Sequence, residues 1–387
     1  MDERDNLETE LTRRLNRRTF LKATFGVTGA ALLAACAPAQ APSPTSAPAK
    51  PAAAQPTTAP ANPAAPAPTA AAAGSSQAAA ANNDQQPLAF KAGTTEPPTS
   101  PVAAGWLKYV QLIDQRTNGK VKISFFPSGQ IGGELEMVQG LQMGTVGMVN
   151  TSTTGYPIYD VLWIPYIFRD MSHMWKVFRG PIGEQWSNQF IKDKGIRVMG
   201  YAYRSPRDLT TSKLKVTKVS DLKGAKIRVP ESPGIVAGFK SFGANPTPMA
   251  WPEVFTALQQ GTVDGQENPL ETIAANKLWE VQKYVMLTQH IYIPWLELID
   301  ERIWQKMTPA TQKIMVDTWN EIADEVQTTV LANDKGYQDT LAKNGMTVVA
   351  PPELDVQSFR DANKDTWKDI APKAWGDGVW EKVQATQ

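Results

Sequence analysis

One helical pattern in the C-terminal third of the chain is too long for a single compact core. It runs from Thr308 to Gly345 in the stretch TPATQKIMVDTWNEIADEVQTTVLANDKGYQDTLAKNG. Thr308 is a typical N-cap residue, and Pro309 suits the first helical turn. Helices of globular proteins average about three to four turns, so a helix of this length has to pack against more than one core. The sequence therefore predicts two lobes bridged by one long helix.

The rest of the folded part alternates between strand-like and helix-like patterns. Strand-like PLAFKAG, KVKISFFPSG and VGMVNTST are separated by helix-like PVAAGWLKYVQLIDQRTNG and GGELEMVQGLQMG. A second unit follows GIRVMGYAY, with the strand KIRVP and the helices PGIVAGFKSFG and WPEVFTALQQG. This alternation predicts an α/β fold with mainly parallel sheets covered by helices. About 300 folded residues is near the limit of one core, which also favours two lobes.

The N-terminal segment, residues 1–36, has the features of an export signal. Arg17 and Arg18 are followed by Phe-Leu-Lys, which resembles a twin-arginine signal. The apolar run 23–35 is shorter than the roughly 20 residues that a membrane-spanning helix needs. It ends in Leu-Ala-Ala-Cys36, which resembles a bacterial lipobox, so we expect Cys36 to be lipidated. The alternative, a buried N-terminal helix, does not need an arginine-rich prefix or small residues before a proline tract.

Residues 37–86 form the next segment, which is dominated by Ala, Pro, Thr, Ser and Gln. Such a composition cannot bury enough apolar surface to offset its chain entropy, so we expect a disordered tether. The signal and the tether together predict export by the twin-arginine route. The protein is then lipid-anchored on the outer face of the bacterial cytoplasmic membrane, in the periplasm or at the cell surface.

Composition excludes several classes of protein. Cys36 is the only cysteine, so neither an intramolecular disulfide nor a cysteine-based zinc site is available. The formal net charge is +1, and no dense basic patch is visible, which argues against a nucleic-acid partner. The chain has only two histidines, and GxSxG, HExxH and phosphate-loop motifs are absent. We therefore predict that the protein is not an enzyme, and we keep an anchored hydrolase as the weakest alternative.

Polar side chains recur at three predicted strand-to-helix junctions of the second unit. Arg204 and Arg207 lie in YRSPRDLTTS, Arg228 lies in KIRVP, and Asn268 ends VDGQENP. Neighbouring strand ends of a parallel sheet meet at one edge, so these side chains are expected to converge. A buried guanidinium needs a counter-charge, and its two parallel donors match a carboxylate. The pattern therefore predicts an anionic ligand, whereas the competing interpretation of Arg228 is a solvated arginine on an edge strand.

Four longer motifs identify a family. SGQIGGELEMVQGLQMGTVGM, DLKGAKIRVP, GANPTPMAWPEVFTALQQGTVDGQENP and LWEVQKYV resemble solute-binding receptors of tripartite ATP-independent periplasmic (TRAP) transporters, of the dicarboxylate-receptor type. The resemblance runs from about Phe90 to the C-terminus. It implies a two-lobed fold like that of periplasmic binding proteins, with hinge strands and a bridging helix. Lobe I then comprises about 87–205 and 294–333, and lobe II about 206–293 and 334–387.

The resemblance also implies roles for individual residues. Arg228 matches the arginine that clamps the ligand carboxylate, and Asn268 matches an amide that contacts it. Arg207 matches a second ligand-contacting arginine. Arg204 stays an alternative, because this chain is one residue longer there than some relatives. Trp251 matches an aromatic position that lines the pocket, although core packing also explains it.

The chain departs from sialic-acid-binding members of the family after the third strand. Those members carry a glutamate and an arginine where this chain has TSTTG, with Ser152 and Gly155. This difference disfavours a heavily hydroxylated, amine-bearing sugar acid. Glu134 falls where some relatives place an acidic ligand contact, but it also suits the N-terminus of a helix.

The function that we expect is capture of an organic acid by an arginine–carboxylate clamp and its delivery to a TRAP permease for import driven by an ion gradient. We expect no cofactor and identify no metal ligand in the sequence. The remaining alternative is the binding protein of an ATP-driven importer, against which the DGQENP and KIRVP motifs argue.

Overall fold

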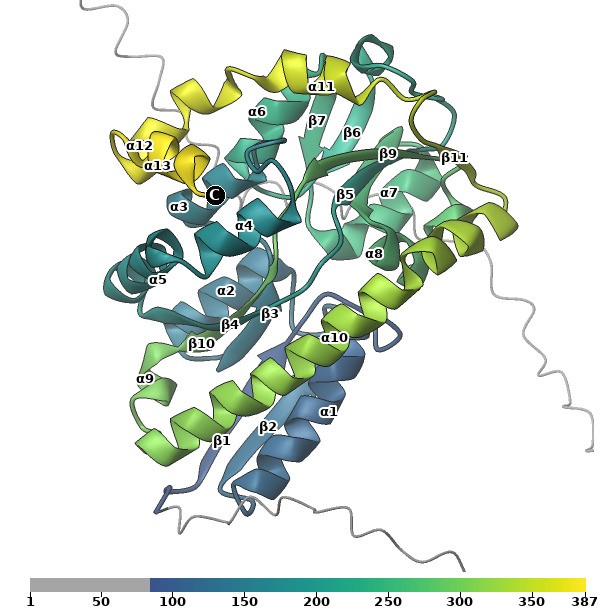
Figure 1. The fold of residues 1–387 in the computed structure, drawn as a ribbon. Helices are drawn as coiled ribbons and strands as arrows, with labels where there is room; N and C mark the ends of the chain where they lie inside the picture. Colours follow the sequence, from purple (N-terminus) through teal and green to yellow (C-terminus); the bar gives the residue numbers. More distant parts are fainter. Residues whose placement is uncertain (1–83) are drawn as a thin grey trace, which may run out of the picture. The chain divides into compact units, whose positions relative to one another are not determined.

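The computed structural model describes residues 84–387, which fold into two sheets with helices around them (Figure 1). The predicted signal segment, the lipidated Cys36 and almost all of the predicted tether lie outside the described residues. Within 84–387, no helix is both long enough and apolar enough to span a bilayer.

The first sheet has the strand order β2-β1-β3-β10-β4. Its parallel part consists of β1 (Leu88–Gly93) between β2 (Val121–Phe126) and β3 (Met148–Thr151). β10 (Trp295–Asp300) runs antiparallel between β3 and β4 (Ile196–Ala202). The helices that pack on its strands are α1 (Pro101–Arg116), α2 (Glu134–Met143) and α5 (Pro181–Lys194).

The second sheet has the order β11-β9-β5-β8-β6-β7. These strands are β11 (Thr347–Val349), β9 (Tyr284–Ile291), β5 (Arg207–Thr211), β8 (Gly265–Pro269), β6 (Lys226–Val229) and β7 (Asn245–Pro248). Its helices include α6 (Pro233–Ser241), α7 (Val254–Gln260) and α8 (Leu270–Ala275).

The sheets are mainly parallel, as expected, but each of them also contains one strand that runs against its neighbours. β10 is antiparallel to β3 and β4, and β5 is antiparallel to β8 and β9. The chain passes between the sheets twice through short segments, 203–206 and 292–294, without a crossover helix. One passage runs from the first sheet to the second and the other runs back, so β4 and β10, and likewise β5 and β9, run in opposite directions and pair antiparallel. They are the strands that join the two lobes.

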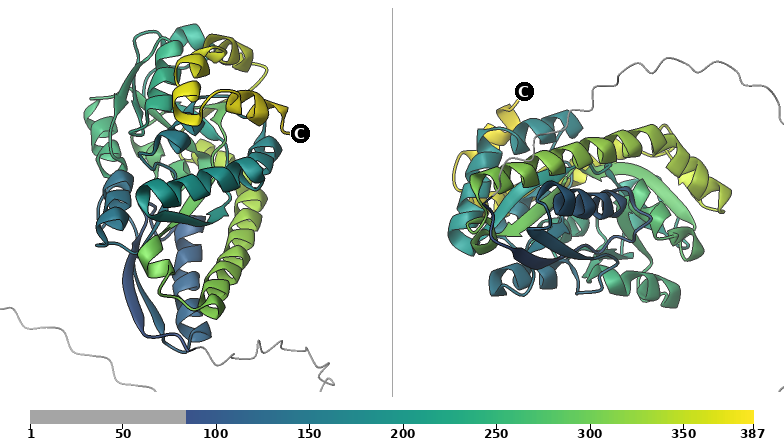
Figure 2. Two further views of the ribbon diagram at one scale, coloured as in Figure 1. Left: turned by 90° about the vertical axis from the view of Figure 1, so that its left-hand side faces the viewer. Right: turned by 90° about the horizontal axis from the view of Figure 1, so that it is seen from below.

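Helix α10 (Pro309–Lys343) confirms the prediction of a long bridging helix. The side chain of Thr308 caps it by accepting a hydrogen bond from the backbone N–H of Thr311, at 3.2 Å. Its 35 residues span about 50 Å at 1.5 Å per residue. It contacts α1 and β4 of the first lobe and α8 and β11 of the second, and it lies beside α1 in both Figure 1 and Figure 2.

The C-terminal helices contact both lobes. The remaining helices are α3 (Pro157–Asp160), α4 (Met171–Phe178), α9 (Glu301–Trp304), α11 (Val356–Asn363), α12 (Ala371–Trp375) and α13 (Val379–Ala385). In α12, Trp375 stacks on Trp186 of α5 with ring centroids 5.0 Å apart, and its indole nitrogen donates to the carbonyl of Ile158. Residues 371–385 were assigned to lobe II, yet they pack on helices of lobe I.

The folded part begins slightly before the predicted boundary at residue 87. Gln85 was placed in the disordered tether, but its side chain is buried. Its Nε2 donates to the carbonyl of Lys306, and its Oε1 accepts from the backbone N–H of Thr308. The tether prediction is therefore wrong at this residue, because Gln85 contacts the segment just before α10.

Two glycines test how α10 contributes to stability. A Cβ on Gly200 of β4 would lie 2.5 Å from the buried Trp319 ring of α10, whereas a Cβ on Gly336 within α10 would meet only Asn333 Oδ1 at 3.7 Å. We predict that Gly200→Ala lowers the free energy of unfolding by about 1–3 kcal/mol through overpacking. Gly336→Ala should raise it by about 0.5–1 kcal/mol through helix propensity. Urea denaturation of both variants measures this, and equal effects would contradict the assigned packing.

Candidate ligand-binding site

All seven residues predicted to contact a ligand line one cavity between the lobes. Its empty space is about 400 Å³ when the part open to solvent is included. The lining comprises the predicted Glu134, Ser152, Arg204, Arg207, Arg228, Trp251 and Asn268, together with Thr95, Glu96, Thr153, Trp163, Pro230, Glu231, Met249 and Ala250. Three arginines therefore share one small space.

Arg228 is a buried residue of an interior strand, and only 3% of it is exposed. Its strand, β6, lies between β8 and β7, so the interpretation as a solvated edge-strand arginine is wrong. Its Nε and one terminal nitrogen donate to the carbonyl of Met249, at 3.0 and 2.6 Å. The other terminal nitrogen has no hydrogen bond to any residue within 84–387. Burial lowers the pKa of Arg228 to about 10, so the side chain stays charged at neutral pH.

Trp251 stands beside this arginine. It begins a short 3₁₀ turn, Trp251–Glu253, and its side chain is only partly buried. The guanidinium carbon of Arg228 lies 5.4 Å from the centroid of its ring, within the range of a cation–π contact. Trp251 therefore forms a flat apolar part of the cavity wall and also packs against buried hydrophobic residues of the second lobe that include Val254, Leu258 and Leu270.

Arg207, at the start of β5, is 1% exposed and is held by an acidic partner. Its Nε and one terminal nitrogen donate to the two carboxylate oxygens of Glu267, at 2.5 and 2.7 Å. The other terminal nitrogen is buried without a partner in the described part of the chain. The guanidinium lies 4.8 Å from the ring of Trp163. One donor of Arg207 therefore remains uncommitted beside the cavity.

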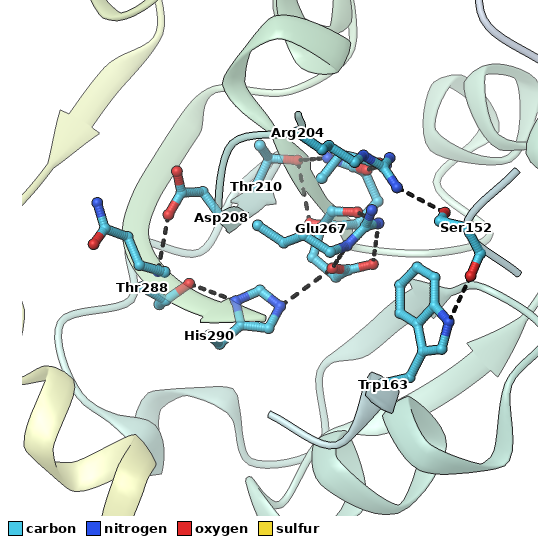
Figure 3. Close-up of polar contacts among 12 residues, drawn as sticks. Ser152, Trp163, Arg204, Asp208, Thr210, Glu267, Thr288 and His290 are labelled. Atoms are coloured by element: carbon cyan, nitrogen blue, oxygen red, sulfur yellow. Dashed lines mark hydrogen bonds and ion pairs between the residues drawn. The ribbon is translucent and has the colours of Figure 1, made fainter. Parts of the chain in front are cut away.

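Glu267 is the centre of a buried polar network (Figure 3). His290 Nε2 lies 3.2 Å from its carboxylate, and Thr288 lies 2.8 Å from the other ring nitrogen of His290. Burial alone raises the pKa of Glu267, but Arg207 and His290 outweigh it and bring the value to about 2. Burial lowers the pKa of His290.

Arg204 connects the two lobes across the cavity. One terminal nitrogen donates to Ser152 Oγ of the first lobe, at 2.7 Å, and the other donates to Asn268 Oδ1 of the second, at 3.0 Å. Figure 3 shows Arg204 reaching toward Ser152. Its guanidinium lies 3.9 Å from the ring of Trp295, and burial lowers its pKa to about 10. Both alternatives for the second arginine, Arg204 and Arg207, thus reach the cavity wall.

The geometry that brings these residues together differs from the expected one. Arg207 starts β5 and Asn268 lies near the end of β8, and the two strands are antiparallel, with Asp208 paired to Asn268. The start of one strand therefore meets the end of the other at the same edge. The residues converge as predicted: Arg228 and Asn268 lie in the parallel strands β6 and β8, whereas Arg207 joins them through antiparallel pairing.

Glu134 lies at a helix N-terminus and also lines the cavity. It is the first residue of α2, next to the helix N-terminus. Its carboxylate accepts hydrogen bonds from the Thr151 hydroxyl at 3.0 Å, from the Thr153 backbone N–H at 2.8 Å, and from the Thr95 hydroxyl at 3.5 Å. It therefore orders two loops of the first lobe while it lines the cavity.

Sequence reasoning missed Glu96, which follows the first strand in GTTEPP. The residue is 2% exposed and lines the cavity. Within residues 84–387, the one hydrogen bond that its carboxyl group accepts comes from the Thr272 hydroxyl of α8, at 3.3 Å. Burial raises the pKa of Glu96 to about 7, with Arg204 opposing and Glu271 and Glu134 adding to the shift. The signal was available, because GTTEPP lies at the end of a strand where such sheets bind ligands.

A cavity lined by three arginines between two α/β lobes, which are joined by strands and spanned by one helix, defines a solute-binding fold. Residues 92–374 match the family described as bacterial extracellular solute-binding protein, family 7 (DctP). The chain belongs to this family and is a TRAP solute-binding protein domain.

Known relatives agree with this assignment. The chain is 32% identical over 292 residues to the 2,3-diketo-L-gulonate-binding periplasmic protein YiaO of Escherichia coli (strain K12), covering 74% of this chain and 88% of the relative. A TRAP periplasmic solute-binding protein of Polaromonas sp. JS666, solved with D-erythronate, has a TM-score of 0.72 at 35% identity. It covers 77% of this chain and 99% of its own length.

A second solved structure gives the same result. The TRAP solute-binding protein of Roseobacter denitrificans OCh 114, solved with L-galactonate, has a TM-score of 0.72 at 31% identity and covers 78% of this chain and all of its own length (100%). These relatives are solute-binding receptors and not enzymes, so the hydrolase alternative is wrong.

The raised pKa of Glu96 should make the stability of the protein depend on pH. The pKa is about 7 in the folded state against an ordinary value of 4.5, so the folded state binds more protons between these values. The free energy of unfolding therefore falls as pH rises from about 4.5 to about 7, by up to about 3 kcal/mol at 1.4 kcal/mol per pKa unit. We predict that Glu96→Gln is more stable than wild type at pH 8 and that this advantage shrinks at pH 5.

Thermal or urea unfolding at both pH values tests this prediction. Glu184→Gln on the exposed face of α5 serves as the matched control and should show no such trend. A stability difference for Glu96→Gln that stays constant with pH would refute a raised pKa.

Proposed function

We propose that the protein captures an organic acid by clamping its carboxylate between buried arginines. The observation that carries this proposal is the presence of three buried guanidinium groups on one cavity, two of which keep a terminal nitrogen without a partner in the described part of the chain. A buried donor that lacks an acceptor costs free energy. A ligand carboxylate offers acceptors for these donors and supplies the missing negative charge.

The proposed clamp assigns a role to each wall of the cavity. Arg228 and Arg207 bind the carboxylate with their free terminal nitrogens. Asn268 contributes its second amide hydrogen, since its Nδ2 already donates to Gln266 Oε1 at 2.6 Å. Trp251 covers one face of the ligand. Arg204 links the two lobes through its hydrogen bonds to Ser152 and Asn268.

The ligands of the relatives support a hydroxylated acid. D-Erythronate, L-galactonate and 2,3-diketo-L-gulonate each combine a carboxylate with hydroxyl groups. The membership in the TRAP receptor family supports delivery of the bound acid to a membrane permease, with import driven by an ion gradient. Closure of the lobes over the acid would exclude water and strengthen the charged contacts.

The central test is substitution of Arg228. Arg228→Lys keeps the charge but loses the planar pair of donors, so affinity for the acid should fall markedly. Arg228→Ala should bind about a hundredfold or more weakly, since charged hydrogen bonds are worth roughly 1.5–3 kcal/mol each. Calorimetry with a panel of sugar acids and their methyl esters measures both effects, and the esters should bind poorly to wild type.

Arg179→Ala, which removes an exposed arginine of the first lobe, is the control and should bind like wild type. If folded Arg228→Ala binds the acid as tightly as wild type, Arg228 does not clamp the ligand.

We also propose that the receptor is exported by the twin-arginine route and anchored through lipidated Cys36. The paired arginines and the Leu-Ala-Ala-Cys sequence support this proposal. Cys36→Ser should abolish labelling by a radioactive or clickable fatty acid and release the protein from the membrane fraction. Cell fractionation with label detection tests this, and unchanged labelling would rule out the lipobox.

A further inference from the structure

The acidic side chains around the cavity are as informative as the arginines. Glu96 and Glu134 belong to the first lobe, whereas Arg207 and Arg228 belong to strands of the second. The charge of Arg207 is matched by Glu267, which lies behind the cavity wall. Glu134 offsets a second positive charge. The three arginines therefore leave at most about one positive charge facing the ligand, and Glu96 and Glu231, which also line the cavity, lower it further, so no positive charge remains for a second carboxylate.

Glu96 differs from the other acidic residues in its partners. One carboxyl oxygen accepts from the Thr272 hydroxyl, and the other has no hydrogen bond within residues 84–387. No lysine, arginine or histidine of the described chain forms an ion pair with it. Arg204 is near enough to influence its charge, but the terminal nitrogens of Arg204 are committed to Ser152 and Asn268.

This arrangement fits one kind of ligand group. A free carboxyl oxygen in a cavity wall can accept a hydrogen bond from a ligand hydroxyl. A second ligand carboxylate at the same place would meet a like charge. Arg204, the cation that acts on Glu96, already donates both terminal nitrogens to Ser152 and Asn268 and keeps only its buried Nε without a partner in the described residues. The charged and titratable groups around Glu96 are Arg204, Glu134 and Glu271, so two of its three charged neighbours are also acidic.

We infer that Glu96 is a specificity-determining residue that hydrogen-bonds a hydroxyl of the bound acid and rejects acids with a second carboxylate at that position. The preferred ligand class is thus a polyhydroxylated monocarboxylate, an aldonate rather than an aldarate or a C4-dicarboxylate. This inference rests on the proposed function, because it concerns the same cavity.

The sharpest test compares ligands that differ only at one terminal carbon. D-Erythronate and meso-tartrate form one such pair, and L-galactonate and galactarate form another, since a CH₂OH group in the first is a carboxylate in the second. Calorimetry at pH 8 should show at least about tenfold tighter binding of the aldonate by wild type. Glu96→Gln keeps the size of the side chain and its ability to form hydrogen bonds but removes the charge. It should reduce the ratio of the two affinities, aldonate over aldarate, at least about tenfold. Glu184→Gln should leave it unchanged.

The outcomes separate the two proposals. A wild-type preference for the aldarate, an unchanged ratio in folded Glu96→Gln, or binding confined to acids without hydroxyl groups would each overturn the inference while the carboxylate clamp stands. Failure of wild type to bind any acid of three to seven carbons would overturn the clamp as well. Because the wild-type ratio needs no variant, the inference remains testable even if Glu96→Gln does not fold.

Discussion

Burial of three guanidinium groups around one cavity is the constraint on which the rest of this structure depends. Charged groups lose hydration when they are buried and need compensating contacts. The compensating contacts differ among the three arginines. Arg207 forms an ion pair with Glu267, and Arg228 donates to a backbone carbonyl. Arg204 donates to a serine hydroxyl and to an asparagine side-chain oxygen. These contacts leave every one of the three side chains with at least one nitrogen that has no partner within the described residues. An anionic ligand is the group that would complete them.

The same contacts link ligand binding to the relation between the lobes. Arg204 donates to Ser152 after β3 of the first sheet and to Asn268 in β8 of the second. The hydrogen bond from Thr272 to Glu96 also crosses between lobes. A ligand that binds only when these groups are assembled stabilises the assembled arrangement in proportion to its concentration relative to its dissociation constant.

Much of the fold and of the site was predictable from the sequence, but the pairing of strands was not. The pattern of KIRVP placed Arg228 at the end of a strand ahead of a helix, and both elements exist, as Lys226–Val229 and Pro233–Ser241. Whether that strand lies at an edge depends on β7 and β8, whose pairing no local pattern encodes. The strands Arg207–Thr211 and Gly265–Pro269 are polar yet wholly buried, so they looked like loops. Their polar side chains satisfy one another, as in the hydrogen bond from Gln266 to Thr210.

The acidic residues were hardest to interpret because their state is set by distant partners. Glu267 and Glu96 are both almost completely buried, and burial alone would raise the pKa of either. Arg207 and His290 hydrogen-bond to Glu267, and the pKa of Glu267 is about 2. Glu96 accepts a hydrogen bond only from a threonine hydroxyl among the described side chains, and its pKa is about 7. Pairing and not burial therefore decides which acid cancels an arginine and which acid faces the ligand. The charge pattern that the cavity presents follows from that division, and it arises only when β5, β8 and the segment after β1 come together.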